Sequence, residues 1–124
     1  MKFSRIRISN RSTNNLAMLK KKTGITPNIL ARFAICMSIK DRSIPNPDEF
    51  DDFGSELAPA VLFGEHESIY LALMLNRLKN DKLDPELYLN KMMRAHLNRG
   101  VIALSPRIND LSDFYEFVKE ERNA

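Results

Sequence analysis

The segment TGITPN, residues 23–28, constrains the fold of this chain more than any other short stretch, because it ends one helix and starts another. Gly24 suits the left-handed conformation that stops a helix. Thr26 is a favoured N-cap residue, and Pro27 suits the first helical position, where its missing N–H is harmless. We therefore expect one helix to end near Lys22 and a second to begin at Thr26, joined by a tight turn.

The residues before this turn predict a short strand. Residues 3–9, FSRIRIS, alternate so that Ile6 and Ile8 share one face while Arg5 and Arg7 share the other. This period of two is typical of a half-buried strand or an extended arm.

Helical spacing of apolar residues flanks the turn on both sides. Ser12 or Thr13 is expected to cap the first helix, whose buried side should carry Leu16, Leu19 and Thr23. The second helix is expected to run to about residue 39, with an apolar face formed by Leu30, Phe33, Ala34 and Met37.

Further helices are expected after a turn-rich connection at residues 45–56. The densely spaced apolar residues of the helix expected at 65–80 indicate that it forms the centre of the core. The next helix should start at Pro85, and the sequence Asn-Arg-Gly at 98–100 should end it. Residues 58–63 fit either a short strand or a loop that packs.

The end of the chain predicts one more helix, starting at Ser105-Pro106 or at residues 109–112, with four residues facing inward: Leu111, Phe114, Tyr115 and Val118. A length of 124 residues is that of one ordinary domain. We therefore predict a single, mainly α-helical domain over residues 1–124, with a short N-terminal strand or arm. No apolar run is long enough to span a bilayer and no signal peptide is apparent, so we expect a cytoplasmic protein without membrane contact.

Charge is distributed unevenly between the two parts of the chain. Residues 1–40 contain nine Lys and Arg and no Asp or Glu, whereas residues 41–124 contain all 16 acidic residues and ten basic ones. Such asymmetry is typical of a basic surface that faces a polyanion. We expect residues 1–40 to be a DNA-facing strand-helix-helix part and residues 41–124 to be an acidic helical body; a solvated basic face without a partner is the alternative.

The turn itself could hold phosphate. Lys20, Lys21 and Lys22 end one helix where the free N–H groups of the next one begin, and helix N-termini attract anions. Lysine is a flexible point charge, so these residues should contact phosphates rather than read bases. The candidate DNA-binding residues are Arg5, Arg7, Arg11, Lys20, Lys21, Lys22, Thr23, Gly24, Thr26 and Asn28.

Catalytic, cofactor and metal signatures are weak throughout. His66 and His96 fall in separate expected helices without zinc-ligand spacing, and Cys36 falls in an apolar helix where a small buried thiol is ordinary. The order Lys-Thr-Gly at residues 22–24 is not that of a phosphate-binding P-loop. We expect no catalytic residue, cofactor or metal; a Mg²⁺-dependent nuclease or phosphatase using the acidic residues at 48–56 is the alternative from another class.

The first 40 or so residues resemble the ribbon-helix-helix family of DNA-binding proteins. The resemblance lies in the order of a strand, a helix, a glycine turn, a Thr-Pro pair and a second helix. That resemblance implies paired strands from two subunits in the major groove, with Arg5 and Arg7 at base edges and Thr26 to Asn28 at a phosphate. A transcription regulator of this kind is the second functional hypothesis.

Nearly the whole chain is similar to the DndE family of DNA sulfur modification proteins. The similarity is carried by RIRIS, LKKKTGITPNILARFAICMSI, LFGE, LDPE and AHLNRGV, and most specifically by TGITPN and AHLNRG. It implies a small, mainly helical, cytoplasmic homotetramer that serves DNA phosphorothioation with other pathway proteins. It also implies binding of duplex DNA, notably nicked duplex, through surface lysines in the region of Lys20, Lys21, Lys22, Thr23 and Gly24. The sulfur chemistry would reside in other subunits, so this chain would be non-catalytic.

Overall fold

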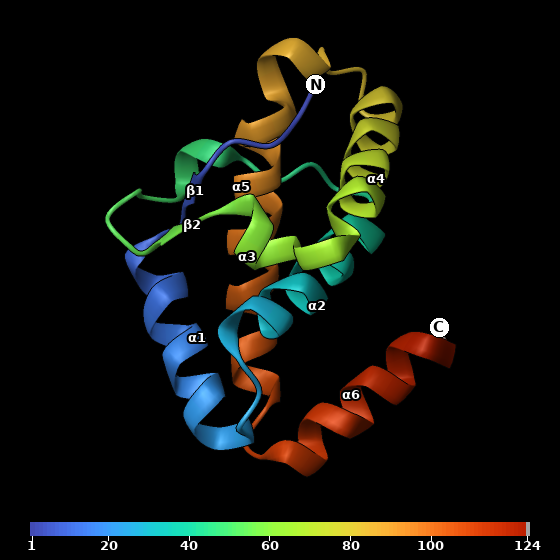
Figure 1. Cartoon of the computed structure of the whole chain (residues 1–124). Coiled ribbons are helices and arrows are strands. Elements are labelled where there is room, and N and C mark those ends of the chain that lie inside the picture. Colours follow the sequence, from blue (N-terminus) through green and yellow to red (C-terminus); the bar gives the residue numbers. More distant parts are fainter. Residues whose placement is uncertain (124) are drawn as a thin grey trace.

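Two helices, α2 (Pro27–Lys40) and α5 (Pro85–Leu104), cross at the centre of the structure, and the other elements pack around them (Figure 1). The computed structural model describes residues 1–123. Four further helices are present in this range: α1 (Asn10–Thr23), α3 (Pro59–Phe63), α4 (Glu67–Asn80) and α6 (Leu111–Asn123). Short 3-10 turns, η1 (Pro47–Glu49), η2 (Gly64–His66) and η3 (Ser105–Arg107), link them. The predicted mainly α, single-domain fold is confirmed.

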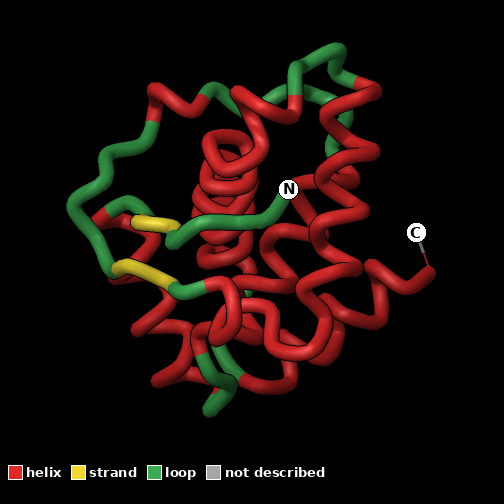
Figure 2. Tube along the Cα trace, turned by 45° about the horizontal axis from the view of Figure 1, so that its top comes forward, coloured by secondary structure: helices red, strands yellow, loops and turns green. Residues whose placement is uncertain are grey.

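The two-stranded sheet is small and lies on one side of the helices (Figure 2). Strand β1 (Ile6–Arg7) pairs antiparallel with β2 (Glu56–Leu57), so that Ile6 lies opposite Leu57. Ile6 and Ile8 are buried while Arg7 is exposed, which confirms the predicted alternation.

The other edge of the N-terminal segment is held by side chains one turn apart on α5. Asn90 accepts a hydrogen bond from the backbone N–H of Ser4 at 2.8 Å, and Asn98 accepts one from that of Ser9 at 3.0 Å. Between them, the Arg94 guanidinium donates to the backbone oxygen of Arg7 at 2.8 Å. Both edges of this strand are therefore engaged within one chain.

The helix α1 starts three or four residues earlier than predicted. Ser9, not Ser12 or Thr13, is its N-cap, because the Ser9 side chain accepts from the backbone N–H of Ser12. The predicted end is confirmed: Gly24 has φ 77°, and its N–H donates to the Lys20 oxygen at 2.8 Å.

The predicted end of α5 is wrong, because the helix continues through residues 98–100 to Leu104. Gly100 lies where α5 meets α2: a Cβ at this position would be 2.0 Å from the backbone oxygen of Ala34. The glycine therefore permits close approach of two helices and does not terminate one.

Three other expectations are corrected by the packing. Residues 59–63 form the short helix α3, although Leu62 and Phe63 are fully buried, as expected of a packed segment. Helix α4 is peripheral, with Ile69 57% exposed, because α5 fills the centre where α4 was expected. In α6, Phe114 and Phe117 are buried while Tyr115 is 63% exposed, so the inward face is rotated from the predicted one.

Two arginines cap the C-terminal end of α2. Arg77, which is 6% exposed, donates to four backbone oxygens at residues 39 and 41–43 and pairs with Asp81 at 2.7 Å. Arg99 donates to the Ser38 backbone oxygen at 2.7 Å and to its hydroxyl at 2.8 Å. The carbonyls left unpaired at the helix end thus receive charged donors from α4 and α5.

His96 is fully buried beside this cap. Its Nδ1 lies 2.8 Å from the Ser38 hydroxyl. Arg99 also donates to that hydroxyl oxygen, and the buried Nε2 of the ring has no hydrogen-bond partner among the described residues. Burial, together with the positive charges of Arg77 and Arg99, lowers the His96 pKa to about 3, so the ring is neutral near pH 7.

This buried imidazole makes stability depend on pH. The unfolded chain protonates His96 near pH 6.5, whereas the folded chain does not until about pH 3. In this window the unfolded state binds more protons, so the free energy of unfolding should fall by about 1.4 kcal/mol per pH unit on acidification. Urea unfolding at pH 7 and pH 5 should differ by about 2 kcal/mol from this group alone.

The variant His96→Gln should remove most of that pH dependence, and the matched variant of the exposed His66, His66→Gln, should retain it. Equal slopes in the two variants would contradict the assignment to His96.

No helix within residues 1–123 is long and apolar enough to cross a membrane.

Candidate nucleic-acid interface

The exposed face of α1 carries basic, polar and apolar side chains and no acid. Ser12, Leu16, Leu19 and Thr23 are buried, so the opposite side of the helix faces solvent. The solvent side includes residues at spacings of four, three and four that lie in one line along the helix. These are Arg11, Asn15, Met18 and Lys22, with Lys21 beside them.

Three consecutive lysines, Lys20, Lys21 and Lys22, form the last turn of α1, and all three are exposed. Because successive residues are turned by about 100°, Lys22 continues the line of Arg11 while Lys20 lies on the other flank of the helix. Within the described part of the chain, none has a carboxylate oxygen within 4.0 Å, and the same holds for Arg11. Lysines in a last helical turn also favour the helix dipole, but that role does not require three of them or the absence of counter-charges. The result is a positive helix end open to a polyanion.

The turn after the lysines presents the start of α2 to solvent. Thr26 has the extended backbone of an N-cap residue (φ −67°, ψ 149°), yet its side chain accepts no cap hydrogen bond. The first N–H groups of a helix have no intrahelical partner. Because Pro27 has no N–H and the N–H of Leu30 donates to the Thr26 oxygen, the free groups here are those of Asn28 and Ile29. Gly24, between them and the lysines, is exposed, and a Cβ placed on it would meet no atom within 4 Å.

Two predicted contact residues have other roles here. Thr23 is 7% exposed, and its hydroxyl donates to the Leu19 oxygen at 2.7 Å and accepts from the N–H of Ile25 at 3.1 Å. The Asn28 amide donates to the Val61 oxygen at 3.3 Å. The Thr23 side chain therefore holds the turn in shape, and that of Asn28 ties the start of α2 to α3.

Arg5 and Arg7 lie at the other end of α1 and are partly neutralised. Each has a guanidinium nitrogen near Glu56 of β2, at 3.6 and 3.7 Å, and Arg7 also donates to the Gly54 oxygen at 3.2 Å. Arg11 and Lys21 are ten residues apart on α1, which corresponds to about 15 Å along the helix. The structure thus separates the predicted residues into two groups at opposite ends of one helix, with Arg11 on the side of β1.

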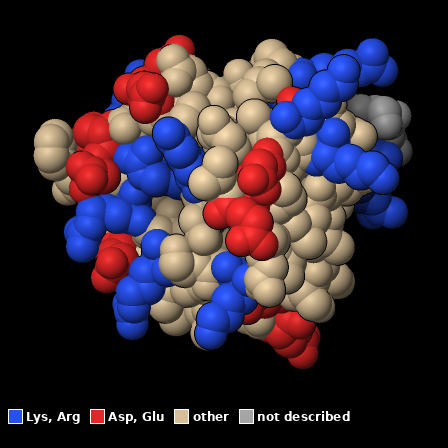
Figure 3. Space-filling view, turned by 90° about the horizontal axis from the view of Figure 1, so that it is seen from above, with Lys and Arg blue, Asp and Glu red and all other residues tan. Residues whose placement is uncertain are grey.

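Charges elsewhere are more mixed than the sequence halves indicated. Lys40 of the basic part pairs with Glu121 of the acidic part at 3.0 Å. On the face shown in Figure 3, acidic and basic side chains are interspersed. Tertiary contacts therefore reduce the charge asymmetry away from α1.

The acidic loop has a structural role at its centre. The Asp51 carboxylate accepts from the backbone N–H groups of Asn10 and Phe53, both at 2.9 Å, and these bonds lower its pKa. Residues 1–123 hold no group of three or more His, Cys, Asp and Glu side chains arranged for a metal ion.

A groove beside α2 is a feature that the sequence did not reveal. Its walls come from α4 and α6, which are far apart in the chain.

Comparison with known proteins gives a consistent result. A family model described as DNA sulphur modification protein DndE matches residues 5–111. The crystal structure of DndE from Escherichia coli B7A, described as involved in DNA phosphorothioation modification, is 28% identical with a TM-score of 0.67, covering 84% of this chain and 98% of that one. A second structure, of a DndE mutant involved in DNA phosphorothioation, is 27% identical with a TM-score of 0.66, covering 84% and 99%. No curated protein sequence matches.

Proposed function

Because the chain belongs to the DndE family of DNA sulphur modification proteins, we propose that it is a DNA-binding subunit of phosphorothioation that contacts the backbone of duplex DNA. The contact surface is the exposed side of α1 together with the turn into α2. Arg11, Lys20, Lys21 and Lys22 supply the positive charge, and the N–H groups of Asn28 and Ile29 supply neutral donors.

The observation that carries this proposal is the exposed face of α1, which has four cations and no acidic residue along its 14 positions. A duplex carries one phosphate charge per roughly 1.7 Å of its axis, so a row about 15 Å long meets several phosphates at once. Lysine is suited to phosphate as a point charge, and no aromatic side chain lies on α1 to stack on an unpaired base. The surface therefore fits a duplex backbone better than a base sequence.

Arg5 and Arg7 are assigned a secondary part in this contact. Their partner Glu56 competes with phosphate, and both edges of β1 are occupied within the chain. A strand so engaged gives no support to a ribbon shared between two subunits, which favours the backbone-binding role over a base-reading regulator.

Within the pathway, the chain acts as a non-catalytic cytoplasmic component, and other proteins supply the sulfur chemistry. We assign it a preference for nicked duplex and a homotetrameric assembly on the strength of the family resemblance. Aligned copies of the α1 face would convert weak phosphate contacts into strong binding through effective concentration.

Fluorescence anisotropy with labelled nicked and intact duplexes across a salt series tests the proposal. If about five cations contact phosphate, log K should fall with log salt at a slope of roughly −4 to −5. We expect tighter binding of the nicked duplex and no cleavage when Mg²⁺ is added. Absence of binding to both duplexes at low salt would reject the DNA-binding role, and Mg²⁺-dependent cleavage would reject the non-catalytic role.

A further inference from the structure

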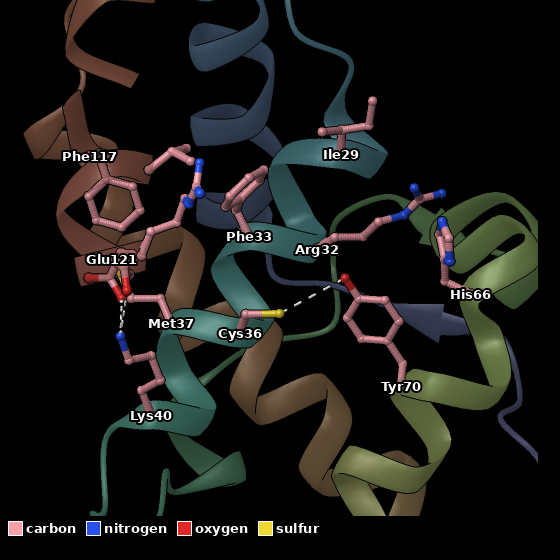
Figure 4. Close-up of a pocket in the computed structure, with 12 residues that line it drawn as sticks. Ile29, Arg32, Phe33, Cys36, Met37, Lys40, His66, Tyr70, Phe117 and Glu121 are labelled. Atoms are coloured by element: carbon pink, nitrogen blue, oxygen red, sulfur yellow. Dashed lines mark hydrogen bonds and ion pairs between the residues drawn. The ribbon is translucent and has the colours of Figure 1, made fainter. Parts of the chain in front are cut away.

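A groove of about 480 Å³ runs along the outer side of α2, between η2 and α4 on one side and α6 on the other (Figure 4). This volume is within the range of small-molecule sites, which are mostly apolar with a few polar groups. The apolar part of the lining is formed by Ile29, Phe33, Met37, Phe117 and Val118. The groove is separate from the α1 surface proposed to contact DNA.

The α6 wall is held by contacts with α2 and lies almost entirely outside the residues matched by the family model. Phe114 packs edge-on against Phe33 with ring centroids 5.1 Å apart, and the Glu121 carboxylate pairs with Lys40 at 3.0 Å. The family model ends at residue 111, where α6 begins. The groove therefore combines a family core with a wall supplied by residues beyond it.

Charge in the groove favours an anion. Glu121 is the one acidic residue in the lining, and its carboxylate is occupied by Lys40, which leaves Arg32 and Arg122 without a carboxylate within 4.0 Å among the described residues. Cys36 and Tyr70, whose sulfur and oxygen atoms are 3.9 Å apart, lie between the walls. Burial raises the pKa of both groups, that of Tyr70 to about 12, so neither adds negative charge near pH 7.

Arg32 is the group placed to orient such an anion. Its Nε donates to the Leu62 oxygen, which fixes the guanidinium at the η2 side of the groove. The Nη2 atom of Arg32 lies beside Gly64, so close that a Cβ on this glycine would be 3.1 Å from it. Neither Nη atom of Arg32 donates to an oxygen among the described residues, so both remain available to a ligand. A planar fork with free donors suits a carboxylate, which it can bind through two parallel hydrogen bonds.

We propose that this groove binds a small organic anion: a carboxylate held by Arg32 and carried on an aromatic or short aliphatic body that lies against Phe33, Met37 and Phe117. Burial of the apolar body would contribute most of the binding free energy, and the carboxylate would fix the orientation of the ligand in the groove.

Titration of the full chain with 4-phenylbutyrate, followed through ¹³C-labelled methionine methyl groups, tests the proposal. The Met37 methyl resonance should shift and saturate, while that of Met18, exposed on α1, should not move. The neutral analogue 4-phenylbutan-1-ol should bind about tenfold or more weakly, because a hydrogen-bonded charge is lost.

Arg32→Gln should weaken 4-phenylbutyrate binding by a similar factor, and Arg32→Lys should give an intermediate value. The control Arg42→Gln removes an exposed cation outside the groove and should have no effect. The proposal is overturned if Met37 does not respond up to the solubility limit of the acid, or if the acid and the alcohol bind equally well. Equal binding by wild-type and Arg32→Gln would also overturn it.

Discussion

Replacing Lys20, Lys21 and Lys22 together by Gln is expected to weaken duplex binding by about 500-fold near 0.1 M salt. Each phosphate contact contributes about 0.9 to the slope of log K against log salt, which at 0.1 M salt corresponds to about eightfold in affinity per contact. Three lost contacts therefore give about 500-fold, and the salt slope should become shallower by about 2.7. Both quantities come from one anisotropy series on wild-type and variant.

The fold should tolerate these changes, because all three side chains are exposed and have no acidic partner among the described residues. The loss of favourable charge at the helix end costs some tenths of a kcal/mol per residue. A matched control replaces three exposed lysines elsewhere, Lys79, Lys91 and Lys119, and lowers the net charge equally. If the control loses as much affinity as the α1 variant, binding depends on total charge and the proposed surface is wrong.

The sequence predicted those structural elements whose form depends on residues close together in the chain. Gly24 and Pro27 mark the turn between α1 and α2 because their backbone restrictions act within a few residues. The alternation of Ile6 and Ile8 likewise reports a strand face directly. The candidate lysines could be located in this way, since a helix end and a run of cations are both visible in sequence.

Features that depend on distant partners could not be predicted. Asn98, Arg99 and Gly100 form a sequence that ordinarily ends a helix, yet each is explained by a contact with another part of the chain: Ser9, Ser38 and Ala34 respectively. The ion pairs of Arg5 and Arg7 could not be predicted for the same reason, because their partner Glu56 is 49 or more residues away in the chain. The end of the stretch AHLNRG thus has a packing role.

This packing role predicts that Gly100→Ala will destabilise the protein strongly, by about 3 kcal/mol or more. The added methyl group would lie 2.0 Å from the Ala34 oxygen and 2.5 Å from its carbonyl carbon, so two backbones would have to separate. Alanine is intrinsically better in a helix than glycine by about 1 kcal/mol, which offsets only part of this cost. Since domains of this kind are stable by about 5–15 kcal/mol, the loss should be evident in urea unfolding.

Two further variants separate this clash from other effects of adding a methyl group. In Gly24→Ala, the added Cβ would have no atom within 4 Å, so the only cost is that alanine must adopt the left-handed conformation at φ 77°. This should lower the free energy of unfolding by about 1–2 kcal/mol. Ala34→Gly should not rescue Gly100→Ala, because the obstacle is the backbone of residue 34 and not its side chain. A Gly100→Ala protein as stable as the wild type would show that α2 and α5 can move apart freely. The central crossing would then not fix the positions of α1 and its lysines.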